Sequence, residues 1–185
     1  MKNTKIILTT AILSVAFVLV SFRFVSKMWT IDASHAKINW SMPKGKHSGT
    51  FGGLVATVDF DPAHPESAAI KATIDAKTVD AGIGALNEHL QSADFFDVAN
   101  HPLISFTSES VAKTDSGFVA KGKLAMRDSI HEISIPFHFN EDQDGNAVMV
   151  GTMDIFSGDY GVGKKSEAGN DEVVIKIAVP VSAKE

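Results

Sequence analysis

The stretch "FVAKGKLAM", residues 118–126, decides the fold because every second residue is apolar or small and lysines stand between them. Successive side chains of a β-strand point to opposite faces of its sheet. Phe118 and Leu124 would therefore lie on a dry face, and Lys121 and Lys123 on a wet one. The pattern predicts a strand that is buried on one side.

The same period of two recurs from Trp29 almost to the end of the chain. It predicts about eight strands, which cover residues 29–40, 54–60, 70–74, 104–108, 118–126, 133–139, 147–156 and 173–181. Turn-forming residues fill the short breaks, among them "DPAHPES" (61–67), "KTDSG" (113–117) and "EDQDGN" (141–146). Short breaks indicate antiparallel neighbours in meander order.

One segment has helical spacing instead. Between Asp80 and Gln91, the apolar residues Ile83, Leu86 and Leu90 fall three and four positions apart. The expected fold class is thus all-β, an eight-stranded antiparallel sheet with one short helical excursion. Such a sheet buries its apolar face by closing into a barrel, whose interior is either filled by side chains or holds one small ligand.

The first 22 residues, "MKNTKIILTTAILSVAFVLVSF", indicate export. Two lysines precede an uncharged apolar run from Ile6 to Phe22, as in the charged and apolar regions of a secretory signal. The following residues offer no small-x-small cleavage site, and a run of this length can also span a bilayer. Residues 1–26 are therefore expected to be a signal peptide or an uncleaved signal anchor, and residues 27–185 the exported domain.

Composition excludes several classes of function. The 185 residues contain no cysteine and carry a formal net charge of −5, so disulfides and thiol chemistry are excluded and no nucleic-acid partner is expected. The seven histidines are scattered over expected strands and turns without a close ligand pair. A metal site assembled by folding stays open, although structural or surface histidines are favoured.

Three near-motifs fail at a required position. "GDYGVGKKS" (158–166) resembles a phosphate-binding loop, but Lys165 stands where a magnesium-binding Ser or Thr is needed. "NEDQDGN" (140–146) starts like a calcium loop, but its twelfth position is Gly151, where a Glu is required. "HEISI" (131–135) lacks the second histidine of a zinc protease. No cofactor, no metal and no catalytic residue is expected.

The segment "EHLQSADFFDVANHPLISFTS", residues 88–108, resembles the signature of the YceI-like family. In that signature a helix ending in His-Leu precedes Ser-x-Asp-Phe-Phe-Asp and then a strand. Further segments are similar in order and spacing: "WTIDASHAKINW" (29–40), "GTFGGLVATVDFD" (49–61) and "SGDYGVG" (157–163). The resemblance covers nearly the whole of the chain after the N-terminal segment.

The resemblance implies an eight-stranded, lipocalin-like barrel with an elongated apolar cavity. Family members are exported bacterial proteins thought to bind polyisoprenoids or other long-chain amphiphiles. This chain is then expected to be a periplasmic or otherwise extracytoplasmic protein that transports, stores or sequesters such a lipid. Transient membrane contact and a homodimer stay open. Phe95 and Phe96 would form an apolar plug at the mouth of the barrel, or would only seat the helix.

Two other functions are alternatives. The first is an enzyme of isoprenoid or quinone lipid metabolism that uses His35 or His89 as acid or base, because histidine titrates near neutral pH. The second is a ligand-free stress-response or interaction module whose interior is filled by its own large aromatic side chains.

The residues that line the cavity are predicted from register, because one parity of each strand must face inward together. The apolar parity is clear in the strands at 118–126 and 173–181. Leu86 and Leu90 lie one helical turn apart and are expected to flank the mouth, with His89 at its polar rim. The predicted contacts with the hydrocarbon chain are Phe106, Phe118, Leu124, Phe137 and Ile175.

This register yields a matched pair of variants. Ala120→Trp enlarges an inward position, so we expect it to reduce the amount of lipid that the protein carries. Val119→Trp makes the same change on the outer face and should leave lipid loading almost unaltered. Loading is measured by mass spectrometry of extracted lipid, and equal loading in both variants would show that the parity was misread.

Overall fold

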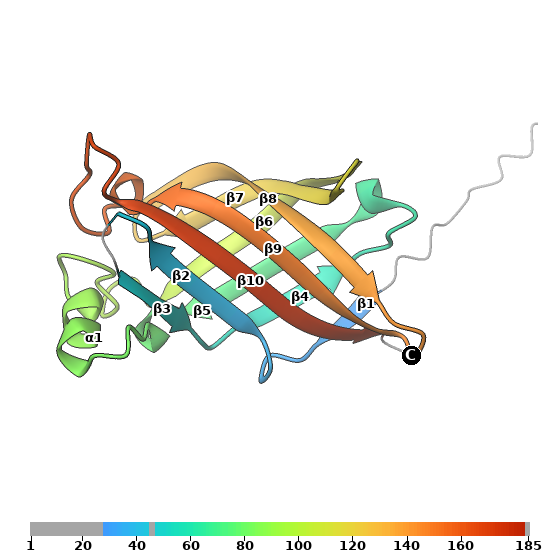
Figure 1. The fold of residues 1–185 in the computed structure, drawn as a ribbon, viewed down its shortest axis with the longest axis horizontal. Helices are drawn as coiled ribbons and strands as arrows, with labels where there is room; N and C mark the ends of the chain where they lie inside the picture. Colours follow the sequence, from blue (N-terminus) through green and yellow to red (C-terminus); the bar gives the residue numbers. More distant parts are fainter. Residues whose placement is uncertain (1–27, 45–46, 184–185) are drawn as a thin grey trace, which may run out of the picture.

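The computed structural model describes residues 28–44 and 47–183, which form one antiparallel sheet, one α-helix and three short 3-10 helices (Figure 1). The strands are β1 (Met28–Ile31), β2 (Lys37–Met42), β3 (His47–Phe51), β4 (Val55–Asp59), β5 (Ala69–Asp75), β6 (Leu103–Thr114), β7 (Gly117–Met126), β8 (Ser129–Glu141), β9 (Asn146–Phe156) and β10 (Glu172–Ala183). The helices are η1 (Pro65–Ser67), η2 (Ala76–Thr78), α1 (Gly84–Gln91) and η3 (Ser157–Tyr160).

The predicted signal or anchor at residues 1–26 lies outside the described residues. Within the described part, no helix has the length and apolar character needed to cross a membrane.

The sheet closes into an eight-stranded ring, in the order β1-β4-β5-β6-β7-β8-β9-β10, because β1 pairs with both β4 and β10. The other two strands extend this ring: β2 pairs with β10 beyond β1, and β3 pairs with β2. β1 and β2 therefore lie one after the other beside β10 and together form one strand position of the barrel wall. β3 and β4 together form the next strand position. The all-β, eight-stranded antiparallel barrel expected from the sequence is confirmed.

The break between β1 and β2 and the break between β3 and β4 both have local causes. The prediction of one continuous strand over 29–40 is therefore wrong in this detail. The Asp32 carboxylate accepts hydrogen bonds from the Ser34 hydroxyl (2.6 Å) and from the His35 amide (3.3 Å), so a turn replaces the strand there. The second break falls at Gly53, whose φ of 65° lies outside the β region. Sequence alternation did not reveal β3 as a strand.

The helix is shorter than the segment 80–91 that was predicted. The backbone of Asp80 is already engaged, because its amide and its carbonyl both bond with Thr50, at 3.0 and 2.8 Å. The Asp80 carboxylate also accepts from the Gly82 amide at 2.8 Å, and Gly82 has a φ of 75°. These contacts hold residues 80–82 in a turn, so α1 begins at Gly84.

Strand β6 carries a bulge that reverses which side chains face inward. Ser108 pairs with Gly122 and Ser110 pairs with Lys121, so Glu109 is an extra residue in β6. Ile104 and Phe106 point inward before the bulge, and Val111 is buried after it. Val111 therefore belongs to the core, although continuous alternation through Ser108 would place it outside.

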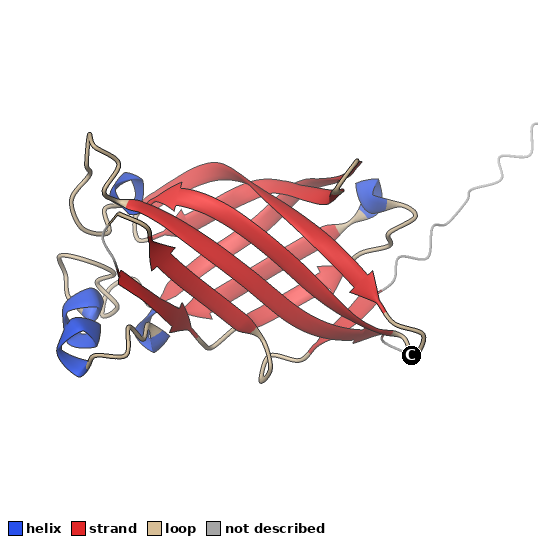
Figure 2. Cartoon of the chain, in the orientation of Figure 1, coloured by secondary structure: helices blue, strands red, loops and turns tan. Residues whose placement is uncertain are grey.

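The barrel has two different ends (Figure 1). The helix end carries α1, the segment 92–102, the turn at 127–128 and the long loop that follows β9. The turn end carries the connections after β4, β6 and β8. Figure 2 shows that the helices lie at these two ends and that strands alone form the walls.

Gly122 permits a close backbone approach beside the bulge, and this yields a stability prediction. A Cβ atom at Gly122 would lie 2.2 Å from the Thr107 carbonyl oxygen. We expect Gly122→Ala to lower the free energy of unfolding by about 1–3 kcal/mol, because the two strands must separate.

The matched control is Gly84→Ala, where a Cβ would meet nothing within 4 Å. Alanine favours helix over glycine, so this variant should be neutral or stabilised by up to about 1 kcal/mol. Urea denaturation measures both. Similar midpoints for the two variants would contradict the close approach.

Candidate functional site: an apolar cavity closed at one end

The inward faces of the strands enclose an apolar cavity of about 160 Å³. All the described strands except β1 contribute to its lining, and Ser105 is the one lining residue with a polar side chain. No charged side chain reaches it from the described part of the chain. The cavity can therefore hold hydrocarbon but offers a buried charge no partner.

Small residues keep this space open. Ala56, Ala72, Ala120 and Gly151 line the cavity at positions where larger side chains would fill it. Inward-facing residues such as Ile175 consequently remain only half-buried. Protein cores normally contain few voids larger than a water molecule, and an empty cavity lowers stability by about 24 cal/mol per Å³. A void of this size is large enough for a small apolar ligand.

Five aromatic side chains close the cavity toward the turn end, and we call this set the aromatic floor. Its members are Trp29, Phe60, Phe118, Phe137 and Phe139. Phe60, directly after β4, is fully buried and meets rings from the opposite wall, with centroids 5.0 Å away at Phe118 and 5.1 Å away at Phe139. Trp29 lies edge-on to Phe139 at 4.9 Å and donates a 2.9 Å hydrogen bond to the Phe60 carbonyl. These contacts bridge the barrel from wall to wall.

The opposite end is covered by α1 and by residues 92–101, which we call the lid segment. Phe95 and Phe96 are half-buried and pack against the core, and Phe96 meets the ring of Phe51, a cavity-lining residue, at 5.4 Å. Leu90 packs there as well. The mouth of the cavity therefore lies at the helix end, under apolar side chains of a loop.

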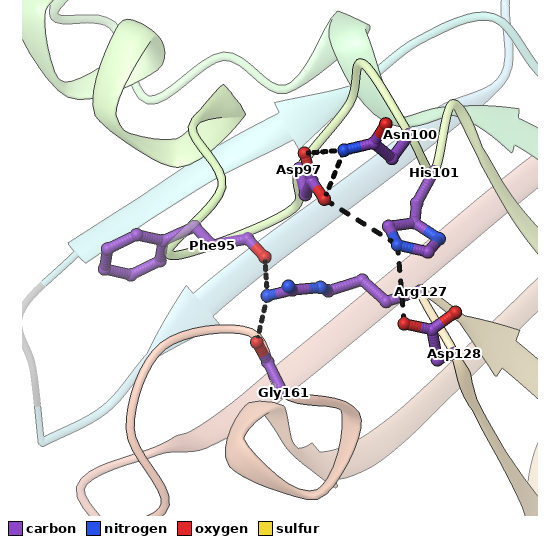
Figure 3. A network of polar contacts seen from close by, with 7 residues as sticks. All are labelled: Phe95, Asp97, Asn100, His101, Arg127, Asp128 and Gly161. Atoms are coloured by element: carbon purple, nitrogen blue, oxygen red, sulfur yellow. Dashed lines mark hydrogen bonds and ion pairs between the residues drawn. The ribbon is translucent and has the colours of Figure 1, made fainter.

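Arg127 ties the lid segment to two other loops (Figure 3). It lies in the turn between β7 and β8 with a φ of 53°, and its Nη1 donates to the carbonyl oxygens of Phe95 (2.6 Å) and Gly161. The amide of Gly163 donates to the Asp94 carbonyl at 3.1 Å. Three loops at the mouth are thus joined mainly by polar contacts.

A second set of contacts surrounds His101, which is mostly buried at the end of the lid segment (Figure 3). Its Nε2 lies 3.7 Å from an Asp97 oxygen and 3.5 Å from an Asp128 oxygen. Asp97 has a φ of 47° and accepts two 3.0 Å hydrogen bonds from the Asn100 side chain. Two loops at the mouth therefore share carboxylates around one imidazole.

An ion pair and a buried phenol also hold the loop after β9. Lys165 Nζ lies 2.6 Å from the Asp159 carboxylate, and this hydrogen bond lowers the pKa of Asp159 and raises the pKa of Lys165. Burial, with a smaller contribution from Asp159, raises the pKa of Tyr160 to about 12. Tyr160 therefore stays neutral and serves as a packing residue.

The structure brings four of the predicted contact residues to the cavity and separates the others from it. Phe106, Leu124, Phe137 and Ile175 line the cavity, and Phe137 also belongs to the aromatic floor. Phe118 belongs to the floor but does not line the cavity. The helical residues do not line it: Leu90 packs on the core, Leu86 is half-buried, and His89 is exposed beside the ring of Phe95 at 4.5 Å. Contact of any of these eight residues with a ligand remains a prediction.

Several lining residues were not named from the sequence. Met149 and Met153 lie on the alternating strand β9, so its period of two carried a usable signal for them. Phe51 lies on β3, for which no strand was predicted. Arg127 had no local signal, because its partners lie 32 and 34 residues away in the sequence.

The histidines considered for catalysis are not at the cavity. His35 Nδ1 lies 2.7 Å from Asp32 on an exposed turn, and the Ser34 hydroxyl lies 3.1 Å from the same nitrogen. A catalytic triad needs the serine on the other ring nitrogen, so this arrangement is a turn and does not form a triad. Over residues 28–44 and 47–183, no cluster of three or more His, Asp or Glu could hold a metal ion.

Comparison with known sequences shows to which protein family the chain is similar. The family model described as YceI-like domain matches residues 29–181. A UPF0312 protein of Azotobacter vinelandii is 28% identical over 157 residues, which is 80% of this chain and 82% of that protein. Protein YceI of Salmonella newport is 32% identical over 98 residues, 51% of each chain, so that match spans about half of the relative.

Solved structures share the fold. The crystal structure of Burkholderia cenocepacia BcnA has a TM-score of 0.76 at 23% identity, over 82% of this chain and 99% of that one. A polyisoprenoid binding domain from Saccharophagus degradans, implicated in plant cell wall breakdown, has a TM-score of 0.61 at 15% identity, over 84% and 98%. At these identities the likeness shows the fold alone.

The Arg127 contacts predict how the mouth is held shut. We expect Arg127→Ala to speed amide hydrogen exchange at Phe96, Asp97 and Gly163 by roughly tenfold or more, because each lost bond joins a charged donor to a carbonyl. Exchange within β7 and β8 should stay unchanged, since the barrel walls do not depend on these bonds.

The matched control is Lys121→Ala, on the exposed outer face of β7. It removes one positive charge without touching the lid segment. Mass spectrometry after hydrogen exchange measures both variants. An unchanged exchange rate in the lid segment of Arg127→Ala would show that Arg127 does not hold it.

Proposed function

The chain belongs to the YceI-like family, and on that premise we propose that it is an exported protein that binds a polyisoprenoid or another long-chain amphiphilic lipid in its apolar cavity. Its role would be to transport, store or sequester that lipid. One observation carries the proposal: the cavity is lined almost wholly by hydrocarbon and is kept open by small residues. The polyisoprenoid binding domain of Saccharophagus degradans, a relative in fold, supports the ligand class.

Apolar burial supplies the driving force. Each methylene group removed from water contributes about 0.8 kcal/mol, so one five-carbon isoprene unit contributes about 4 kcal/mol. Association and ordering of the ligand offset part of this gain. Before those costs are subtracted, two buried isoprene units contribute about 8 kcal/mol, which corresponds to a dissociation constant of about 1 μM.

The orientation of the ligand follows from the two ends of the cavity. The aromatic floor blocks the turn end, and the lining offers no partner for a charged headgroup. The tail would therefore enter first, and the polar head would remain at the helix end, where burial costs least. The lid segment must open for this to happen. The expected compartment is the periplasm or another extracytoplasmic space, which the signal-like N-terminal sequence supports.

Native mass spectrometry of protein purified from its bacterial source without detergent, followed by lipid extraction, tests the proposal. We expect a bound mass that is released on unfolding and that extracts into organic solvent. The Ala120→Trp variant is the blocked control and should carry less. Protein that is repeatedly empty, and that takes up no prenyl or acyl probe, would overturn the proposal and favour a ligand-free interaction module.

A further inference from the structure

We propose that the aromatic floor limits how much of the ligand's apolar tail can be buried. The cavity accepts roughly six to ten carbons, about one to two isoprene units, and a longer tail gains no further affinity. This inference rests on the proposed lipid-binding function and assigns its chain-length preference to named residues.

The volume of the cavity sets the number of carbons. An engineered cavity of about 150 Å³, lined by Leu, Ile and Phe, binds benzene, which has six carbons. The cavity here is of similar size, at about 160 Å³, and equally apolar. It is therefore too small for a long polyisoprenoid, of which only the terminal segment would fit below the mouth.

The floor is built to stay in place. Phe60 is fully buried and touches the rings of Phe118, Phe137 and Phe139 at 5.0–5.5 Å. Phe118 and Phe137 also stack on each other at 5.5 Å, across paired positions of β7 and β8. A ligand that passed this level would have to part rings that come from opposite walls of the barrel. Beyond the rings, the turn end is packed with Ala147 and Val181, which pair with each other and are both buried.

The side walls are more adaptable than the floor. Met126, Met149 and Met153 line the cavity, and the unbranched methionine side chain changes conformation at low cost. Aromatic rings have few rotatable bonds and pack in defined geometries. The width of the bound tail can thus vary, through branching or unsaturation, whereas its inserted length is fixed.

The test measures affinity against tail length. Prenyl alcohols of increasing length, from one isoprene unit to eight, compete with an environment-sensitive fluorescent fatty acid on purified, delipidated protein. We expect affinity to rise roughly fourfold per buried carbon and then to level off at about two isoprene units. Phe118→Ala opens the floor and should move the plateau toward longer tails, by about one unit.

A second variant acts in the opposite direction and does not remove core volume. Ala120→Leu adds bulk to the inner wall one alternation above Phe118, so the plateau should move to a shorter tail. Phe156→Ala removes a ring that is exposed outside the cavity and should leave the plateau where it is. If Phe118→Ala does not fold, the shift in Ala120→Leu decides alone.

The outcomes separate this inference from the function on which it rests. Wild-type protein that binds no alcohol of any length would overturn both. If wild-type affinity keeps rising up to eight isoprene units, the floor does not limit tail length, and lipid binding itself is still supported. A plateau that stays in place in every folded variant would do the same.

Discussion

The pairing of β1 with β10 is the constraint on which the other features depend. Three residue pairs, Trp29 with Ala183, Thr30 with Ser182 and Ile31 with Val181, join the first described strand to the last. They convert an open sheet into a ring, so neither β1 nor β10 is left as an unpaired edge at this level. Closure also turns Trp29 into the interior, where it supports Phe60 and Phe139. The floor therefore exists only in the closed barrel.

Alternation in the sequence predicted the walls well, because a period of two is a local property that each strand carries by itself. It predicted the closed eight-stranded barrel and the inward parity of Phe106, Leu124, Phe137 and Ile175. Alternation did not predict how far along the barrel axis each inward-facing residue lies. Phe118 faces inward as expected but lies in the aromatic floor, beside Phe60. Its position along the barrel axis depends on how far β7 is staggered relative to β4, and these two strands are distant in the sequence.

Three other features depend on contacts between distant segments. The helix begins only at Gly84 because Thr50, which lies 30 residues before Asp80, bonds with the Asp80 backbone. The bulge at Glu109 depends on where β6 meets β7. Arg127 adopts a positive φ, unusual for a residue with a side chain, and its guanidinium holds carbonyls from two other loops. The start of the helix has a local signal as well, in Asp80 and Gly82. The bulge and the Arg127 contacts have no signature in the neighbouring residues.

The two ends of the barrel are stabilised by different kinds of interaction, and this difference is consistent with the proposed lipid binding. The floor consists of buried rings in contact across the barrel, so opening it requires loss of core packing. The mouth is held by hydrogen bonds and ion pairs of Arg127 and His101, on loops that are partly solvated. Regions of few buried contacts open locally at a lower free energy than the core. The mouth can therefore open while the pairing of β1 with β10 and the aromatic floor remain intact, as entry of the proposed ligand would require.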